Sequence, residues 1–434
     1  MLSASRKKEV AALLRSEVKP ALGCTEPIAV ALAAAKSCEL LRTAGVEPEN
    51  LEIEVSGNVL KNGMGVGIPG TGMVGLYIAS ALAQTCGKSE YKLEVFRDLT
   101  SEAIERAKEI VAQKRVKVSV ADTPLKLYVS AVARNGDNYA RTVIENTHDN
   151  IVSYSLNGEV LFEAECSGCD SKNGANDGEG DIVPLDVKTI WDFVHEVDIS
   201  DIQFILDAEM LNRELSKEGL LHDYGMRVGK TIQANIHRDV FGHGLLTHAM
   251  ALTAAASDAR MAGCTLPAMS NSGSGNQGIT VTMPVVAASD RLMSSYDDLA
   301  RALALSHLVA IHIKQYLGRL SALCGCVVAA AGSACGIVYL AKGNYDQVCY
   351  AIKNMIGNIT GMVCDGAKIG CAMKVASGVS CAVQSAILAL ENICISDNEG
   401  IVEADVEQTI RNLAEIGSQG MKETDDMILR IMCN

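Results

Sequence analysis

The stretch LLTHAMALTAAASDARMAG, residues 245–263, carries the pattern that decides the fold of the second half of the chain. Its apolar residues run on well beyond the length of a strand, and most are alanine or other small side chains, which indicates a helix. Small side chains let neighbouring helices approach closely. Helical runs also cover 296–318, 345–361 and 406–417. We therefore predict a mostly α-helical domain over residues 186–434.

The first half of the chain has a different pattern. Residues 1–48 predict two helices separated at Pro20, with Thr25 as the N-cap of the second helix. Residues 49–165 predict a mixed α+β domain, because short runs alternate apolar and polar side chains as strands do. The expected strands cover 51–59, 91–97, 116–120, 126–133, 139–145 and 150–162. Residues 166–185 are rich in Gly, Asp and Asn and predict a polar linker. The expected fold class is therefore α+β, with a mixed α/β N-terminal half and a mostly α-helical C-terminal domain.

The charge and composition of the chain exclude two classes of partner. The net charge is −14, whereas nucleic-acid binding needs clustered Lys and Arg. No run approaches the ~20 uninterrupted apolar residues that span a bilayer, and the N-terminus lacks the apolar run of a signal peptide. We expect a cytoplasmic protein with a small-molecule substrate and neither a nucleic-acid nor a membrane partner. The sequence leaves open whether it forms a homo-oligomer.

The chain contains 15 cysteines, which require an explanation. In a reducing compartment, cysteines are mostly buried apolar residues or metal ligands. Several lie in apolar, Ala-rich runs and are expected in the core: Cys38, Cys86, Cys264, Cys335, Cys349, Cys381 and Cys394. Cys166 and Cys169 form a CxxC without a second pair, so they predict neither a zinc site nor a thioredoxin-like motif.

The segment GMVCDGAKIGCAMKV, residues 361–375, is the strongest candidate for metal ligation. Cys364 and Cys371 flank a glycine-containing loop that can wrap a cluster. The helix expected to begin at Cys371, together with Lys368 and Lys374, predicts a lowered pKa for the Cys371 thiol. The alternative is two half-buried cysteines beside an ordinary loop.

The segment LSALCGC, residues 320–326, offers a further thiolate from Cys324 or Cys326 at the end of a helical run. Three thiolates would leave one iron of a cluster open, which favours Lewis-acid catalysis over electron transfer. A tight helix junction is the alternative interpretation.

Two polar segments complete the candidate site. SNSGSGNQG, residues 270–278, exposes hydroxyls, amides and backbone N–H groups that suit a carboxylate or phosphate, unless it is an ordinary polar loop. Cys24, in GCTEP at 23–27, precedes a helix N-terminus, where a thiolate can act as a base or nucleophile. A capping turn with a bystander cysteine is the alternative there. The glycine-rich stretch at 67–75 predicts a close-packing turn or a lid over the site.

Four motifs, in the order GCTEPIAVALAAA, SNSGSGNQG, LSALCGC and CDGAKIGCAMKV, resemble the L-cysteine desulfidase family, which is related to the iron–sulfur L-serine dehydratases. The resemblance covers essentially the whole chain. It implies a carbon–sulfur lyase, independent of pyridoxal phosphate, that cleaves L-cysteine to pyruvate, ammonia and sulfide. It also implies an oxygen-sensitive 4Fe–4S cluster with three cysteine ligands and one open iron.

The resemblance also assigns residues by motif. Cys364 and Cys371 match two cluster ligands, and the Cys-Gly-Cys element supplies the third, for which Cys324 is chosen and Cys326 is the alternative. Cys24 matches the active-site base. The expected substrate-binding side chains are Ser270, Asn271, Ser272, Ser274, Asn276 and Lys368.

Three other functions remain open at this point. The same cluster can act on L-serine or another β-substituted amino acid, and the ligands would look alike. A pyridoxal-phosphate lyase has no lysine here in a recognisable cofactor context. A non-catalytic iron–sulfur sensor of cysteine would bind its ligand without producing sulfide, and the basic DNA-binding segment typical of such a sensor is missing.

Overall fold

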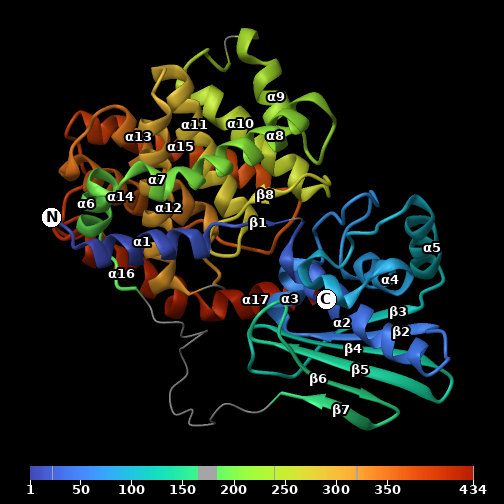
Figure 1. Cartoon of the computed structure of the whole chain (residues 1–434). Coiled ribbons are helices and arrows are strands. Elements are labelled where there is room, and N and C mark those ends of the chain that lie inside the picture. Colours follow the sequence, from blue (N-terminus) through green and yellow to red (C-terminus); the bar gives the residue numbers. More distant parts are fainter. Residues whose placement is uncertain (22, 165–182, 239, 319–320, 434) are drawn as a thin grey trace.

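Figure 1 shows the computed structural model of the chain, which describes residues 1–434 except 22, 165–182, 239, 319–320 and 434. The predicted α+β class is confirmed, with 60% helix and 12% strand, a sheet in the N-terminal half and helices in the C-terminal half. The expected linker at 166–185, apart from residues 183–185, lies outside the described residues, as do Cys166 and Cys169. The domain boundaries remain a prediction.

The N-terminal half is built on one six-stranded sheet. Its strands are β2 (Asn50–Val55), β3 (Val116–Val120), β4 (Tyr128–Asn135), β5 (Asn138–Glu145), β6 (Ile151–Leu156) and β7 (Glu159–Glu163). Their order across the sheet is β3-β2-β4-β5-β6-β7. β2 and β3 run parallel, and the other neighbours are antiparallel. A separate short pair joins β1 (Pro20–Ala21) to β8 (Ala268–Met269).

Helices cover one face of this sheet. α2 (Thr25–Thr43) packs on β4 and β5, while α4 (Leu76–Cys86) lies against β3 and α5 (Ser101–Ala112). Leu51, Ile53 and Val55 of β2 are buried beneath these helices. Glu52 and Glu54 alternate with them and point to the open face, as the two-residue period of a strand requires.

The second half is helical from residue 187 onward. Its helices are α6 (Val187–Glu196), α7 (Ile199–Ile202), α8 (Leu206–Leu221), α9 (Val228–Ala234), α10 (Leu245–Met261), α11 (Gly275–Leu292), α12 (Tyr296–Leu317), α13 (Gly325–Leu340), α14 (Tyr345–Ile359), α15 (Cys371–Leu390) and α16 (Val406–Glu415). The expected close approach occurs. A Cβ added at Gly332 of α13 would lie 2.3 Å from the Ser306 carbonyl oxygen of α12, so these helices touch backbone to backbone.

Two main hydrophobic cores result. One lies under the sheet and contains α2, and the other lies among the C-terminal helices. Val10 and Leu14 of α1 (Ala4–Glu17) belong to the helical core. The two N-terminal helices therefore pack in different cores, α1 in the helical core and α2 in the core under the sheet. α17 (Lys422–Cys433) returns from the helical half to lie beside α3 (Gly57–Gly63), as Figure 1 shows.

α15 is long and apolar enough to cross a membrane by length and composition, although no such run was expected from the sequence. More than half of it is buried inside the fold, where it packs against α10, α13 and α14. Its apolar character is therefore explained by its central place among the helices.

Several local predictions were wrong. Residues 91–97 form no strand, because Ser89–Glu94 is a short 3-10 helix that packs against α2. The strand expected at 51–59 ends at Val55, since α3 begins at Gly57. The one strand expected at 150–162 is the hairpin of β6 and β7. The N-cap of α2 is Cys24, with Thr25 as its first helical residue.

Candidate functional site

Three cysteines of the candidate site lie at the starts of long helices. Cys24 is the N-cap of α2, Cys324 is the N-cap of α13, and Cys371 is the first residue of α15. Cys324 was expected at the end of a helical run, but α12 has already ended at Leu317. A helix N-terminus carries unpaired amides and a partial positive charge, which favours an anionic thiolate.

A short antiparallel bridge brings Cys324 and Cys364 together. Leu323 pairs with Val363, the Cys324 amide donates to the Met362 carbonyl (2.9 Å), and the Cys364 amide donates to the Ala322 carbonyl (2.7 Å). The two cysteines are therefore diagonal neighbours on one face of the bridge. The Cα atoms of such neighbours are about 7 to 8 Å apart, so their side chains can reach toward a common group.

Cys371 and Cys24 meet at a contact between the two halves of the chain. Cys24, Val66 and Met261 form a small buried cluster, against which Ala367 and Cys371 pack. The cysteine loop and the residues around Gly65 are joined by a parallel bridge between Gly65 and Lys368. The sequence motifs that carry Cys24 and Cys371 therefore lie at one site.

The thiols of Cys324 and Cys326 differ in character. A hydrogen bond from the Cys326 thiol lowers the pKa of Cys324 to about 7, although burial opposes this and Lys374 assists it. The same hydrogen bond and burial hold the pKa of Cys326 well above its usual value. The two thiols share this hydrogen bond and titrate as a pair, so the first proton leaves more readily than the second.

The lowered pKa expected for Cys371 is not found. Burial raises the pKa of Cys371 to about 11, and burial together with the charge of Cys324 raises that of Cys364. Lys368 and Lys374 both pair with Asp365. Although burial opposes them, these lysines lower the pKa of Asp365 to about 2. Because both lysines pair with Asp365, they stabilise the cysteine thiolates only weakly. The effect of burial on the thiol pKa values is therefore the larger one.

Cys24 also has a raised pKa and holds its proton as a thiol. Burial, followed by the charge of Glu26, raises the pKa of Cys24 to about 12, and Arg260 acts in the opposite direction. The thiol donates to Glu26 Oε2 (3.3 Å). A proton held by Cys24 therefore has an acceptor within reach.

The polar loop at 270–278 uses several of its side chains to hold its own shape. The Ser270 hydroxyl donates to the Lys19 carbonyl (2.6 Å), and the Ser272 hydroxyl donates to Asn271 Oδ1 (3.0 Å). Ser274 caps α11 by accepting from the Gln277 amide. Asn276 accepts from a guanidinium that the sequence interpretation had missed.

That guanidinium belongs to Arg260, near the end of α10. It donates to the Gly23 carbonyl (2.9 Å) and to Asn276 Oδ1 (3.2 Å), so it joins the GCTEP turn to the polar loop. The sequence carried a weak signal for it, since Arg260 is a charged residue inside the apolar, Ala-rich run at 245–263.

The chain matches a known protein family. The family described as "Serine dehydratase alpha chain" matches residues 90–430, which is most of the chain. The chain belongs to the serine dehydratase alpha chain family.

Similar proteins extend the match over the full length of the chain. A UPF0597 protein of Oleidesulfovibrio alaskensis is 52% identical over 420 residues, covering 97% of this chain and 96% of the relative. A UPF0597 protein of Bacteroides thetaiotaomicron is 49% identical over 430 residues, covering 99% and 98%. One of Chromobacterium violaceum is 45% identical over 419 residues, covering 96% of each.

The serine dehydratase alpha chain family consists of iron–sulfur-dependent lyases, and the donors present here fit such a cluster. Cys324, Cys364 and Cys371 are free thiols that influence one another's pKa. Within the described part of the chain, no three His, Cys, Asp or Glu side chains are close enough to hold a single metal ion. A cluster of several irons is larger than one ion and needs ligands spaced further apart.

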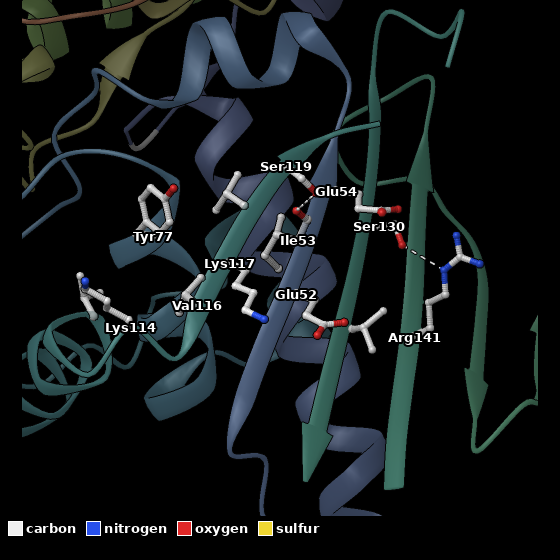
Figure 2. A pocket seen from close by; sticks show the side chains of 13 residues that line it. Glu52, Ile53, Glu54, Tyr77, Lys114, Val116, Lys117, Ser119, Ser130 and Arg141 are labelled. Atoms are coloured by element: carbon white, nitrogen blue, oxygen red, sulfur yellow. Dashed lines mark hydrogen bonds between the residues drawn. The ribbon is translucent and has the colours of Figure 1, made fainter. Parts of the chain in front are cut away.

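A hollow of about 890 Å³ lies elsewhere, around the edge strand β3. Figure 2 shows that Glu52, Glu54, Lys117 and Arg141 reach it from the sheet, whereas Tyr77 and Lys114 come from outside the sheet, and no cysteine is among its lining residues. None of the candidate cysteines and no part of the polar loop at 270–278 lines it, so the candidate functional site is taken to be at the cysteines.

Proposed function

We propose that this chain is an L-cysteine desulfidase, a β-elimination lyase that converts L-cysteine to pyruvate, ammonia and sulfide. Elimination removes the Cα proton and breaks the Cβ–S bond, which gives 2-aminoacrylate and hydrosulfide. Water then hydrolyses the aminoacrylate to pyruvate and ammonium. The overall reaction needs no oxidant or reductant.

In this proposal Cys324, Cys364 and Cys371 hold a 4Fe–4S cluster. When bound, the cluster supplies a Lewis acid at its open iron, which polarises the substrate's leaving group. The choice of Cys324 over Cys326 is supported by the backbone bridge that sets Cys324 beside Cys364, another proposed ligand.

The remaining chemistry falls to the chain's own side chains. Cys24 is proposed as the base that removes the Cα proton, after its own proton has passed to Glu26 Oε2. Arg260 faces Cys24 and favours its thiolate. Burial of Cys24 excludes water from the proton transfer.

The polar loop is proposed to hold the substrate. Ser274 and Asn276 are the best donors, because the hydroxyl protons of Ser270 and Ser272 are already donated within the protein. Ser270, Asn271 and Ser272 then fix the shape of the loop. Lys368, which pairs with Asp365, shapes the cysteine loop and reaches substrate only if that pair opens.

The observation that carries the proposal is the contact of Cys24 with the cysteine loop. Two motifs about 350 residues apart in sequence meet there, since Cys371 packs against the buried cluster of Cys24, Val66 and Met261. A candidate base thus lies beside a candidate cluster ligand, as an elimination requires.

Dehydration of L-serine is the second candidate, and the description of the matching family favours it. The two reactions share every step except the leaving group. The test is an assay of the anaerobically reconstituted protein on equal concentrations of L-cysteine and L-serine, with pyruvate as the readout. A higher kcat/KM on L-cysteine supports the desulfidase, and a higher value on L-serine replaces it with the dehydratase.

A further inference from the structure

Arg260 is a buried cation without an acidic partner. Its side chain is 6% exposed, and none of the described Asp or Glu residues forms an ion pair with it. Among the described residues its guanidinium donates to the Gly23 carbonyl, Asn276 Oδ1 and the weakly accepting Met261 Sδ, and it also faces the Cys24 thiol, while its Nε is buried without an acceptor there. An arginine cannot shed its proton, so the positive charge persists.

A buried arginine without a negatively charged partner lowers the stability of the fold, unless an anion binds beside it. Removing a charge from water carries a penalty that neutral acceptors offset only in part. Arg213 illustrates the usual solution in the same protein, since it pairs with Glu209 and with both carboxylate oxygens of Asp290. Arg260 has hydrogen bonds but lacks the negative charge.

The surroundings of Arg260 favour an anion. Its Nε lies against the start of α11, where a Cβ added at Gly275 would be 2.2 Å from Nε. The amides of Gly275 and Asn276 belong to the first turn of this helix and have no intrahelical acceptor. The helix N-terminus adds a partial positive charge at the same place.

A second unpaired group lies on the same turn of α11. Gln277 is buried, and its Oε1 has no hydrogen-bond partner. That oxygen lies 3.4 Å from the position of a Cβ added at Gly325, between Cys324 and Cys326. It therefore borders the cysteines.

A buried network fixes which end of the Gln277 amide faces outward. Asn271 Nδ2 lies 3.3 Å from the His307 carbonyl, which can only accept, so Asn271 turns its Oδ1 toward Gln277. Gln277 Nε2 then donates to Asn271 Oδ1 (2.7 Å), which leaves Oε1 free. Thr282 holds the other side of the His307 ring at 3.1 Å. The free oxygen is thus an oriented acceptor.

We propose that the start of α11 is an α-amino-acid subsite, in which Arg260 binds the carboxylate and Gln277 Oε1 accepts from the ammonium group. This assignment rests on the proposed function and names its recognition chemistry. Binding the carboxylate beside Cys24 brings Cα–H to that thiol and leaves the side chain to point toward the cysteine loop. Arg260 then sets the specificity for substrates with a free α-carboxylate.

The test uses ligands that lack a leaving group, so that binding is measured without turnover. Reconstituted protein is titrated calorimetrically with L-alanine, propionate and ethylamine, which carry both groups, the carboxylate alone and the amine alone. L-alanine is expected to bind best. In Arg260→Met, L-alanine affinity falls at least about 30-fold and the affinity for ethylamine is unchanged. Gln277→Leu lowers the affinity for L-alanine and ethylamine but leaves propionate binding unchanged.

Matched variants guard against a general loss of structure. Arg213→Met serves as the control arginine and should bind L-alanine as the wild type does. Gly275→Ala keeps Arg260 but displaces its guanidinium, so it should also weaken L-alanine binding. If Arg260→Met loses its cluster absorbance, Arg260→Lys is tested in its place. Lysine keeps the positive charge but lacks the planar guanidinium that donates two parallel hydrogen bonds, so we expect an intermediate affinity for L-alanine.

The outcomes separate this subsite from the proposed reaction. Wild-type L-alanine affinity in folded Arg260→Met and in Gly275→Ala overturns the subsite, whatever the reaction is. Arg260-dependent L-alanine binding in a protein that releases no sulfide from L-cysteine overturns the desulfidase and leaves the subsite standing. With L-cysteine as substrate, Arg260→Met should raise KM more than it lowers kcat.

Discussion

At the scale of single residues, the Cys-Gly-Cys turn shows that two thiols only two positions apart in sequence can have different surroundings. Cys324 precedes α13 and lies on the bridge with Cys364, whereas Cys326 faces Thr280 of α11 and Gly378 of α15. The sequence left the two as alternatives because both flank the same glycine. Their environments differ only through tertiary contacts, which no local pattern contains.

The first prediction separates these two cysteines. Cys324→Ala should lose iron after reconstitution, because a proposed ligand is removed. Cys326→Ala should keep most of the iron, although the Cys324 thiolate loses its hydrogen-bond donor. Iron and labile sulfide per chain are the measurements. The reverse pattern would transfer the third ligand to Cys326.

The second prediction concerns Cys24. Cys24→Ala should retain the broad cluster absorbance and lose turnover, because the candidate base is removed and the three candidate ligands remain. Cys38→Ala provides the matched control, since it removes another buried thiol of the same helix. Activity near the wild-type level in Cys24→Ala would remove Cys24 from the mechanism.

At the scale of elements, the site depends on glycines that let segments meet without side chains between them. Gly67 lies on the end of α10, and a Cβ there would be 2.3 Å from the Ala262 carbonyl carbon. The Gly67 amide donates to the Met261 carbonyl (2.9 Å). The stretch at 67–75 therefore includes the close-packing contact that its glycines predict, next to Met261 of the Cys24 cluster.

The third prediction tests this contact. Gly67→Ala should destabilise the protein by about 1 to 3 kcal/mol, because an added methyl in a packed contact forces backbone shifts. It should also lower the iron content, since Met261 belongs to the buried cluster against which Cys371, a proposed ligand, packs. Gly242→Ala is the control, because a Cβ there meets nothing within 4 Å. Equal melting temperatures for both variants would contradict the tight contact.

The elements that the sequence could predict are those whose pattern is purely local. α12 and α14 begin at Tyr296 and Tyr345, where the expected helical runs begin. The segment at 91–97 alternates like a strand but has no neighbour to pair with, so it folds as a 3-10 helix instead. Periodicity reports the shape of a segment and contains no information about its partners.

At the scale of the whole molecule, the site lies where the sheet-containing half meets the helical half. Lys61 of α3 is 2% exposed and pairs with Asp425 of α17, so the C-terminal helix is tied back to the N-terminal half. The Lys61 carbonyl also lies 2.1 Å from the position of a Cβ at Gly366, in the cysteine loop. Hydrophobic patterns predicted the two halves, but these long-range contacts required the structure.

The fourth prediction tests this tie. Asp425→Asn should lower the stability by up to about 3 kcal/mol, because the buried Lys61 charge loses its partner. Asp426→Asn changes the exposed neighbouring carboxylate and should have little effect. Thermal unfolding of the two variants gives the comparison. If both unfold at the wild-type temperature, the Lys61–Asp425 pair does not hold α17 in place.

Arg260 and His307 show what sequence reasoning missed in the site. Both lie within apolar helical runs, where a lone polar residue is usually a satisfied core residue. The pKa of His307 is lowered to about 3 by burial, so it acts as a neutral support for Asn271. The four motifs predict where the site lies, whereas these supporting residues are recognisable only from their partners.

The most direct test of the account is sulfide release by anaerobically reconstituted protein. The wild-type protein should show a broad iron–sulfur absorbance and release stoichiometric sulfide and pyruvate from L-cysteine. Both should disappear in the Cys364→Ala variant. A wild-type protein that shows no cluster absorbance after reconstitution, or that holds the cluster but releases no sulfide, would contradict it.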